Sequence, residues 1–190
     1  MQLVSAIQSF QEQPKQQGNI TLSIIVPVYN EQAMLAMFHH ELAQTLALLP
    51  KEQIEVIYVN DGSTDNSWKI MQSLPSIHAN IELVNLSRNF GKEAAMTAGL
   101  DLCRGQSAIL LDADLQDPPN LIPQMLNKWR EGFDVVNMRR SDRQGESAFK
   151  KACAHIYYRL LRKLSDVEIA TDVGDFRLLS RRVIDDIKKL

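Results

Sequence analysis

The chain has 190 residues, of which 45% are hydrophobic and 23% are charged. This composition is typical of one globular domain with its own core, and it excludes a disordered or fibrous protein. The formal net charge of −2 argues against a protein whose main partner is nucleic acid, because such domains carry a clear basic excess.

Cysteine and histidine usage gives no sign of a zinc site. Cys103 and Cys153 lie far apart, neither belongs to a Cys-x-x-Cys pair, and we expect both to be buried in a protein of a reducing compartment. His39 and His40 are expected to form an ordinary surface pair on a helix.

No stretch reaches the roughly 18 apolar residues of a membrane span, and the N-terminus lacks the layout of a signal peptide. The chain as given is expected to be soluble.

Residues 1–19 are rich in Gln without a sustained apolar period, so we expect a flexible leader before one domain at 20–190. Within that domain, short β-branched apolar runs alternate with segments that have helical spacing or helix-start signals. In chain order these are a strand at Leu22–Val28, a helix from Asn30, a strand at Ile54–Val59, a short helix after Asp65, a strand at Ile81–Leu86, a helix at Lys92–Cys103, a strand at Ser107–Leu111, a helix from Pro118 to about Arg130, a strand at Phe133–Met138, a helix at Ser147–Leu164 and a helix from near Ser180. This alternation predicts an α/β fold, with a mostly parallel sheet and helices on both faces.

Local signals set the ends of several predicted helices. Asn30 and Asp117 are expected to be N-caps, and Pro118 suits the first position of a helix. Gly105 and Gly132 are placed to end the helices that precede them.

Polar side chains follow the predicted strands where each one ends, and ligands of such sheets bind at that edge. Asp112 and Asp114 come after a buried apolar run, and residues two apart in a strand point to the same side. Two carboxylates facing one ion suit Mg²⁺ or Mn²⁺, which also bind a substrate diphosphate, and Gln116 adds an amide oxygen. In the alternative reading these acids cap the next helix, which fits Asp117 better than Asp112 because a buried, unpaired carboxylate is costly.

Two further acids allow two interpretations each. Asp61 is either a turn former or an acceptor for a donor group of a base or ribose. Glu31 is either a nucleotide contact or a first-turn acid that the helix dipole favours. Neither GxGxxG nor GxxxxGK[ST] occurs, and Lys92 follows a Gly without the rest of that phosphate loop. A nucleotide would therefore be held in another way.

Taken together, these residues resemble the family 2 glycosyltransferases of the GT-A fold. Three strand ends carry the resemblance: Ile24-Ile25-Val26-Pro27-Val28-Tyr29-Asn30-Glu31, Val59-Asn60-Asp61-Gly62-Ser63-Thr64-Asp65 and Asp112-Ala113-Asp114-Leu115-Gln116-Asp117-Pro118-Pro119. Within the family the chain is most similar to the polyprenyl-phosphate glycosyltransferases, which include bactoprenol glucosyltransferases and dolichol-phosphate mannose synthases. Two segments carry this second match: Leu86-Ser87-Arg88-Asn89-Phe90-Gly91-Lys92-Glu93 and Val173-Gly174-Asp175-Phe176-Arg177-Leu178.

The resemblance implies a role for each residue that matches a family motif. It implies a nucleotide pocket lined by Pro27, Tyr29, Glu31, Asp61, Lys92 and Asp112, and a metal and diphosphate site at Asp112, Asp114 and Gln116. Asp114 and Asp175 would be the catalytic residues, with Asp175 as the general base of an inverting displacement. The dolichol branch has Ser-Gly-Phe-Arg at this point, and a phosphate acceptor is already an oxyanion at neutral pH, so the role of Asp175 stays open.

A basic stretch is consistent with a phosphorylated acceptor. Eight cationic and two acidic residues lie between Arg139 and Lys163, a balance that suits a lipid phosphate at an anionic membrane surface. Arg139 and Arg143 are the expected acceptor-phosphate contacts, and Lys150 and Lys151 are expected to face the bilayer. A solvated helix face is the alternative interpretation of this charge run.

The resemblance therefore implies transfer of a hexose, with UDP-glucose as the leading donor, to a polyprenyl phosphate at the cytoplasmic face of the membrane. Similar proteins continue into membrane helices, so the chain is expected to be the catalytic part of a longer protein. Two alternatives remain: a metal-dependent phosphohydrolase of the Asp-x-Asp type, and a domain that binds sugar nucleotides without turnover. The sequence leaves the oligomeric state open, a homo-oligomer included.

Overall fold

The computed structural model describes residues 20–139 and 173–189, and the side chains of residues 139 and 173–175 are outside that description. The chain divides into one compact unit of residues 1–136 and 175–190 and a second of residues 137–174. The second unit is described only at 137–139 and 173–174. Every statement below on the core and the candidate site concerns the first unit.

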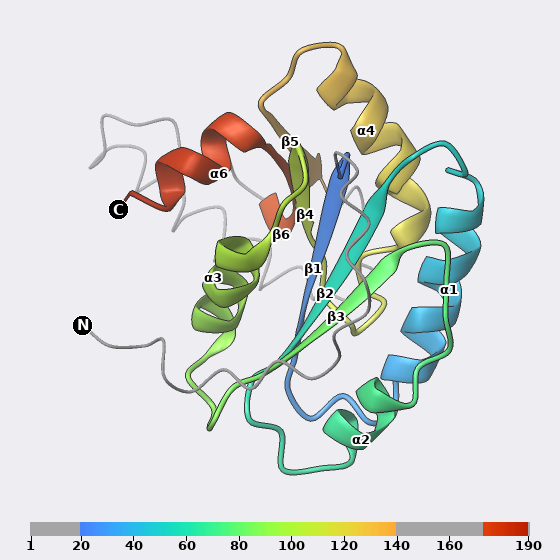
Figure 1. Ribbon diagram of the computed structural model, residues 1–190, viewed down its shortest axis with the longest axis vertical. Coiled ribbons are helices and arrows are strands. Elements are labelled where there is room, and N and C mark those ends of the chain that lie inside the picture. The colour runs from blue at the N-terminus through green and yellow to red at the C-terminus, as the bar shows by residue number, and fades with distance from the viewer. Residues whose placement is uncertain (1–19, 140–172, 190) are drawn as a thin grey trace, which may run out of the picture. The chain divides into compact units, whose positions relative to one another are not determined.

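A six-stranded sheet with the order β3-β2-β1-β4-β6-β5 forms the centre of the fold (Figure 1). Its strands are β1 Leu22–Val28, β2 Ile54–Asn60, β3 Asn80–Asn85, β4 Ser107–Leu110, β5 Val135–Arg139 and β6 Val173–Ser180. β1 pairs in parallel with both β2 and β4, and β2 pairs in parallel with β3. β6 pairs antiparallel with β4. The predicted α/β fold with a mostly parallel sheet is confirmed.

Helices cover both faces of this sheet, as predicted. Figure 1 shows α3 and α6 on one side and α1, α2 and α4 on the other. The helical elements are α1 Leu35–Ala47, α2 Ser67–Gln72, α3 Lys92–Leu102, the 3-10 turn η2 Pro119–Leu121, α4 Ile122–Arg130 and α6 Arg181–Ile187. No helix within residues 20–139 and 173–189 has both the length and the apolar character that a membrane crossing requires. The helix predicted at 147–164 and the leader at 1–19 lie outside the described residues.

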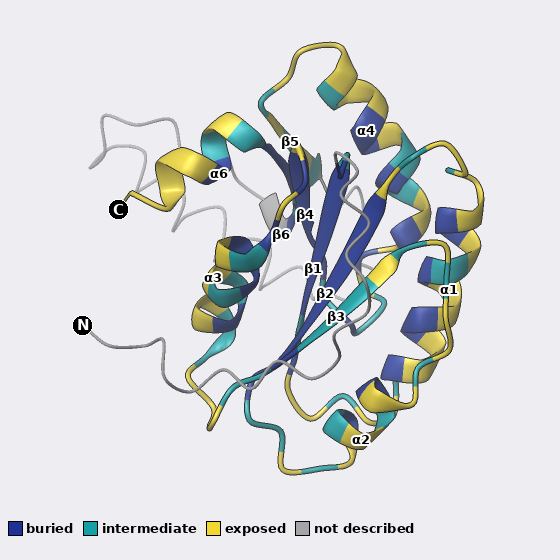
Figure 2. Cartoon of the chain, in the orientation of Figure 1, coloured by how far each residue is buried: buried dark blue, intermediate teal, exposed yellow. Residues whose placement is uncertain are grey.

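The inner strands are buried on both faces, which explains their continuous apolar runs. Alternate residues of β1 serve the two layers: Ile25 packs in the core cluster with Ala95 and Leu100 of α3. The other layer includes Phe38 and Leu42, which are fully buried on α1. Figure 2 shows this pattern as fully buried inner strands between helices whose outer faces are exposed.

The predicted strands at 22–28, 54–59, 81–86, 107–111 and 133–138 are found to within two residues at each end. β6 was not predicted, because Gly174, Asp175 and Arg177 interrupt its apolar pattern. It forms through its ladder to β4, in which Ser107 pairs with Ser180 and Leu110 with Arg177. Ser180 also begins α6 as predicted, and its side chain accepts a hydrogen bond from the Val183 amide.

Two predicted helix caps are wrong. Asn30 has a left-handed φ of 56°, and its side-chain oxygen accepts a hydrogen bond from the Thr64 amide at 2.8 Å. Helix α1 begins only at Leu35, so Asn30 connects two loops and does not cap a helix. Asp117 is buried, and the N-cap positions of η2 and α4 are held by Pro118 and Leu121.

The predicted role of Gly105 as a helix end is also wrong. Helix α3 ends at Leu102, and Cys103 is already extended and buried. A side chain at Gly105 would place its Cβ 2.6 Å from the backbone nitrogen of Ser23. Glycine is therefore required there for close packing against β1. Gly132 does follow the end of α4 as predicted, with a φ of 101°.

His39 is buried and does not form a surface pair with His40, which is exposed. The Pro75 carbonyl can only accept a hydrogen bond, so the Nε2 of His39, 2.9 Å away, carries a hydrogen. The Nδ1 of the neutral ring then accepts from the Tyr58 hydroxyl at 2.8 Å. Burial lowers the pKa of His39 below its ordinary value, against a smaller opposite effect of the Pro75 carbonyl.

We expect this buried histidine to make the stability pH-dependent. An unfolded chain protonates His39 as the pH falls through about 6.5, whereas the folded protein keeps it neutral to a lower pH. The unfolded state then binds more protons, so the free energy of unfolding decreases as the pH falls below that value. His39→Gln, which retains a donor and an acceptor, should flatten this decrease in urea titrations between about pH 7.5 and 5.5.

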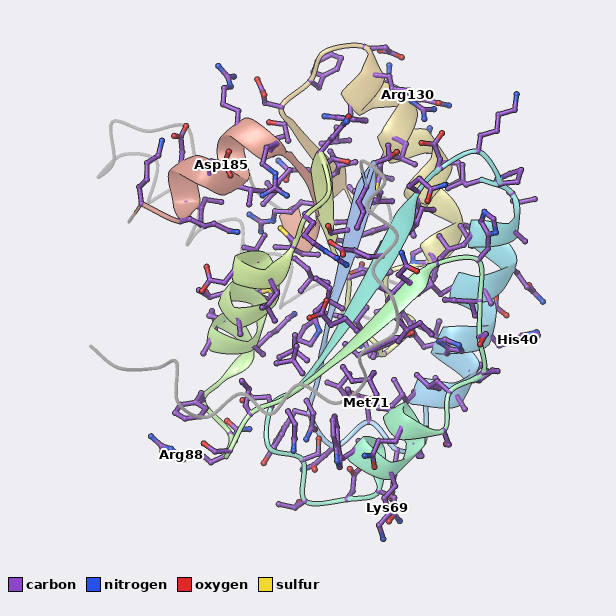
Figure 3. The ribbon with its side chains drawn as sticks, viewed as in Figure 1. His40, Lys69, Met71, Arg88, Arg130 and Asp185 are labelled. Atoms are coloured by element: carbon purple, nitrogen blue, oxygen red, sulfur yellow. The ribbon has the colours of Figure 1, made fainter. Side chains whose placement is uncertain are left out.

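His40→Gln on the exposed side of the same helix (Figure 3) is the matched control and should leave the pH dependence unchanged. Equal pH dependence in wild type and His39→Gln would contradict the prediction.

Candidate functional site

The carboxyl ends of the parallel strands meet at one edge of the sheet. Val28, the last residue of β1, pairs with Asn60, the last residue of β2. The Asp61 amide extends this contact by donating to the Val28 carbonyl at 2.8 Å. On the other side of β1, the Leu111 amide donates to the Ile25 carbonyl at 3.0 Å. The segments that follow the three strands therefore begin at the same edge, where sheets of this kind bind ligands.

The Asp112 carboxylate is partly buried and forms an ion pair with Lys92. The Lys92 Nζ lies 2.6 Å from Asp112 Oδ2, and the two side chains are 37% and 23% exposed, respectively. Lys92 is the first residue of α3, whereas Asp112 follows β4. The structure thus brings together two residues that the sequence assigned separately to the nucleotide pocket.

The Asp114 carboxylate lies on a strained turn after β4. Its Oδ1 accepts a hydrogen bond from the Gln116 amide at 2.9 Å, and Leu115 between them has a left-handed φ of 60°. Leucine rarely adopts this conformation, and such strain persists where the surrounding structure holds it. β4 ends at Leu110, so Asp112 and Asp114 both lie beyond the strand, and Asp114 lies in a turn. The expectation that the two carboxylates point to the same side, which came from strand geometry, therefore does not apply to them.

Three carboxylates act on that of Glu31 at this edge. Burial raises the pKa of Glu31, and the negative charges of Asp114, Asp112 and Asp65 raise it further, in that order. Glu31 is itself positioned by its backbone amide, which donates to the Ser67 hydroxyl at 2.8 Å. Glu31, Asp112 and Asp114, here called the acidic cluster, thus concentrate negative charge in one region.

The acidic cluster fits a hard divalent cation that shares its ligands with a substrate. Within residues 20–139 and 173–189, no group of three or more His, Cys, Asp or Glu side chains is arranged to hold a metal ion. Mg²⁺ and Mn²⁺ sites of phosphate-transfer enzymes commonly use one or two carboxylates and take the remaining ligands from water and phosphate oxygens. Asp112 and Asp114 meet that requirement, and the Gln116 side chain is exposed beside them.

Asp61 is buried and holds the loop that joins β3 to α3. Its two carboxylate oxygens accept hydrogen bonds from the Phe90 amide at 2.7 Å and the Gly91 amide at 3.0 Å. Gly62 lets the same loop approach, since a Cβ on Gly62 would lie 2.3 Å from the carbonyl carbon of Arg88. This clamping role is one that the sequence analysis missed, because the partners lie 29 and 30 residues further along the chain.

Two exposed aromatic rings lie on segments that follow β1 and β3. Tyr29 after β1 is 45% exposed and Phe90 is 37% exposed. The Arg88 guanidinium lies 4.5 Å from the centre of the Phe90 ring, on the loop between β3 and α3 where Figure 3 labels Arg88. Pro27 is partly buried in β1. These side chains offer planar surfaces and a cation to a base or a phosphate.

A second set of contacts joins the β1–α1 loop to the β2–α2 loop. The Asn30 amide donates to the Ser63 hydroxyl at 3.0 Å, and the Gln32 amide donates to Asp65 Oδ2 at 3.1 Å. No local signal in the sequence predicts these contacts, because each joins residues 33 apart in the chain. Their effect is to fix the backbone on either side of Glu31.

The residues expected at the acceptor side are only partly described. Arg139 ends β5 with its side chain outside the description, and Arg143, Lys150 and Lys151 lie outside the described residues. β6 runs antiparallel to β4 with Leu110 opposite Arg177. Asp175 precedes Arg177, so its backbone continues β6 toward the edge at which Asp112 follows β4.

Comparison with known proteins gives a consistent result. Residues 23–188 match the family described as Glycosyl transferase family 2. The chain is 44% identical over 172 residues to the glycosyltransferase YkcC of Bacillus subtilis (strain 168), covering 90% of this chain and 53% of YkcC. It is 40% identical over 169 residues to the bactoprenol glucosyl transferase of Shigella phage SfV, covering 89% of this chain and 55% of that protein. The chain thus spans about half the length of these relatives.

Two solved structures share the fold. The glucosyl-3-phosphoglycerate synthase of Mycobacterium tuberculosis, in complex with Mn²⁺, UDP-glucose and phosphoglyceric acid, superposes with a TM-score of 0.57 at 21% identity, covering 86% of this chain and 58% of the synthase. Staphylococcus aureus TarS (residues 1–349) gives a TM-score of 0.54 at 19% identity, covering 89% of this chain and 49% of TarS. With its sheet order, its strand-end motifs and the match over residues 23–188, this chain belongs to the family 2 glycosyltransferases.

Proposed function

We propose that this domain transfers a hexose, most favourably glucose, from a UDP-sugar to a polyprenyl phosphate at the cytoplasmic face of the membrane, with inversion at the anomeric carbon. The observation that carries the proposal is the acidic cluster with Lys92 at the carboxyl edge of the sheet. Carboxylates and an ammonium are the groups that a metal-bound diphosphate requires. The 40% identity to a phage bactoprenol glucosyl transferase supports the sugar and the lipid acceptor.

Four residues of the site have distinct roles in this proposal. Asp112 and Asp114 hold the divalent cation, which supplies a Lewis acid for the leaving diphosphate when it is bound. Asp61 keeps the β3–α3 loop in place through the Phe90 and Gly91 amides. Tyr29 offers an exposed ring to the base.

The acceptor side of the proposal rests on the motif around β6 and on the basic stretch. Asp175 would take up the acceptor proton or orient an acceptor oxygen that is already ionised. Arg139 and Arg143 would contact the acceptor phosphate, which matches the cationic excess between Arg139 and Lys163.

A Mn²⁺-dependent transfer assay on the intact protein in membranes tests the whole proposal: radiolabelled glucose should move from UDP-glucose into an extractable polyprenyl phosphate. Absence of labelled lipid with an active donor-binding site would overturn the acceptor assignment.

Replacing either aspartate of the turn should weaken metal-dependent donor binding. Asp112→Asn and Asp114→Asn each remove a negative charge while retaining the side-chain shape. We expect the affinity for UDP in the presence of Mn²⁺, measured by isothermal titration calorimetry, to fall by more than about tenfold, since even outer-shell changes at metal sites cost about 10- to 100-fold. Asp101→Asn, at an exposed position of α3, is the control and should bind as the wild type does. Unchanged binding by both turn variants would refute the metal assignment.

Loss of the Asp61 clamp should reduce both stability and donor affinity. In Asp61→Asn, the side-chain NH₂ group would lie against a backbone N–H that in the wild type donates to a carboxylate oxygen, so one of the two hydrogen bonds is lost. We expect the free energy of unfolding to fall by about 1 kcal/mol, the lower end of the cost of an unsatisfied donor, because the two amides are only partly buried. UDP affinity should fall as well, because the loop that carries Phe90 and precedes Lys92 loses its anchor. Chemical denaturation and calorimetry on one preparation test both effects; a destabilised variant with unchanged UDP affinity would show that the loop does not contact the donor.

A further inference from the structure

We propose that Lys92 is an exchangeable counter-ion of the metal site: its ammonium holds Asp112 until a divalent cation and a nucleoside diphosphate bind together, and it then transfers to a phosphate oxygen of the nucleotide. The inference rests on the proposed function and adds to it a coupling between metal and donor. The observation behind it is the 2.6 Å contact between Lys92 Nζ and Asp112 Oδ2.

The backbone at Lys92 is fixed, whereas its side chain is partly exposed. Asp61 and Gly62 hold the loop up to Gly91, and α3 begins with Lys92 itself. The Lys92 side chain is 37% exposed, and its four-carbon stem lets the ammonium change partners without a change in the backbone. Any exchange at this site is therefore confined to a side-chain rotation.

The charges around Asp112 explain why an exchange is favourable. Glu31 and Asp114 add negative charge to that of Asp112; after burial, the charges of Asp114 and Asp112 are the next causes of the raised pKa of Glu31. The ammonium of Lys92 offsets part of this repulsion. A divalent cation that approaches the Asp112 carboxylate meets a positive charge already bonded to it, and like charges at such short range repel.

A nucleoside diphosphate removes this conflict. Its phosphate oxygens accept hydrogen bonds from the ammonium and also coordinate the cation, so both positive charges gain a partner. Metal and nucleotide should therefore bind with positive coupling, and the coupling is reciprocal by thermodynamic necessity. A site of this kind binds the metal weakly by itself and tightly with the donor.

The test is the affinity for Mn²⁺ with and without UDP, measured from the free Mn²⁺ signal in electron paramagnetic resonance. In Lys92→Met, which retains most of the side-chain length without the charge, Mn²⁺ alone should bind at least about fivefold more tightly than in the wild type. The ratio of Mn²⁺ affinities with and without UDP should shrink by a similar factor. A residue with only a structural role would not raise the Mn²⁺ affinity in the absence of UDP and at the same time reduce the gain in Mn²⁺ affinity that UDP provides.

Three further variants complete the experiment: two controls and one replacement test variant. Lys92→Arg keeps the charge and should keep weak Mn²⁺ binding in the absence of UDP. Lys92→Gln is a second neutral variant, used if Lys92→Met does not give a cooperative thermal transition. Lys128→Met removes the ammonium of an exposed ion pair with Glu131 on the far end of α4 and should leave both Mn²⁺ affinities unchanged.

The outcomes separate this inference from the proposed function. If the wild type binds Mn²⁺ with UDP and neutral variants at position 92 bind Mn²⁺ alone no more tightly, the counter-ion role is overturned and the glycosyltransferase proposal stands. If the wild type binds neither Mn²⁺ nor UDP, the proposed metal-dependent function is overturned and the inference fails with it.

Discussion

The parallel pairing of β1 with β2 and with β4 is the constraint on which the site depends. Parallel ladders align the carboxyl ends of neighbouring strands, so the segments after Val28, Asn60 and Leu110 leave the sheet at one edge. Residues from distant parts of the sequence are then brought into one small region, although no pattern in the sequence links them to one another. The inner strands are covered on both faces, which fixes their register through burial and leaves the edge open for polar loops.

The loops at this edge are held to different degrees. Asp61 and Gly62 bind the β3–α3 loop through its backbone, and Asn30 joins the first two loops through side-chain hydrogen bonds. Backbone contacts of this kind preorganise a site, which lowers the entropy that ligand binding must offset. The Lys92 side chain differs, because its contact with Asp112 is an ion pair between partly exposed groups. In our proposal this ammonium exchanges Asp112 for a phosphate oxygen, while the backbone frame around it stays fixed.

The acidic cluster gives the family assignment a chemical meaning. Burial raises the pKa of Glu31, and the neighbouring carboxylates of Asp114 and Asp112 raise it further. A divalent cation with a diphosphate would relieve the repulsion among these carboxylates. Family membership argues against the phosphohydrolase that an Asp-x-Asp pair by itself also suits, and against a domain without turnover. The sugar, the lipid acceptor and the roles of Asp175 and Arg139 remain proposals that the binding and transfer experiments address.

The sequence by itself determined the elements that depend on neighbouring residues: the five apolar strands, the start of α6 near Ser180 and the family motifs at the strand ends. It placed Asp61 and Asp112 at one edge of the sheet but did not identify the residue that each of them contacts. Only the tertiary structure decided that β6 pairs with β4, that His39 is buried, and that Asp61 clamps a loop 29 residues away. The reason is physical: strand runs and caps are set by contacts within a few residues, whereas ladder pairing, burial and the choice of an acid's partner are set by contacts that form only when the sheet closes.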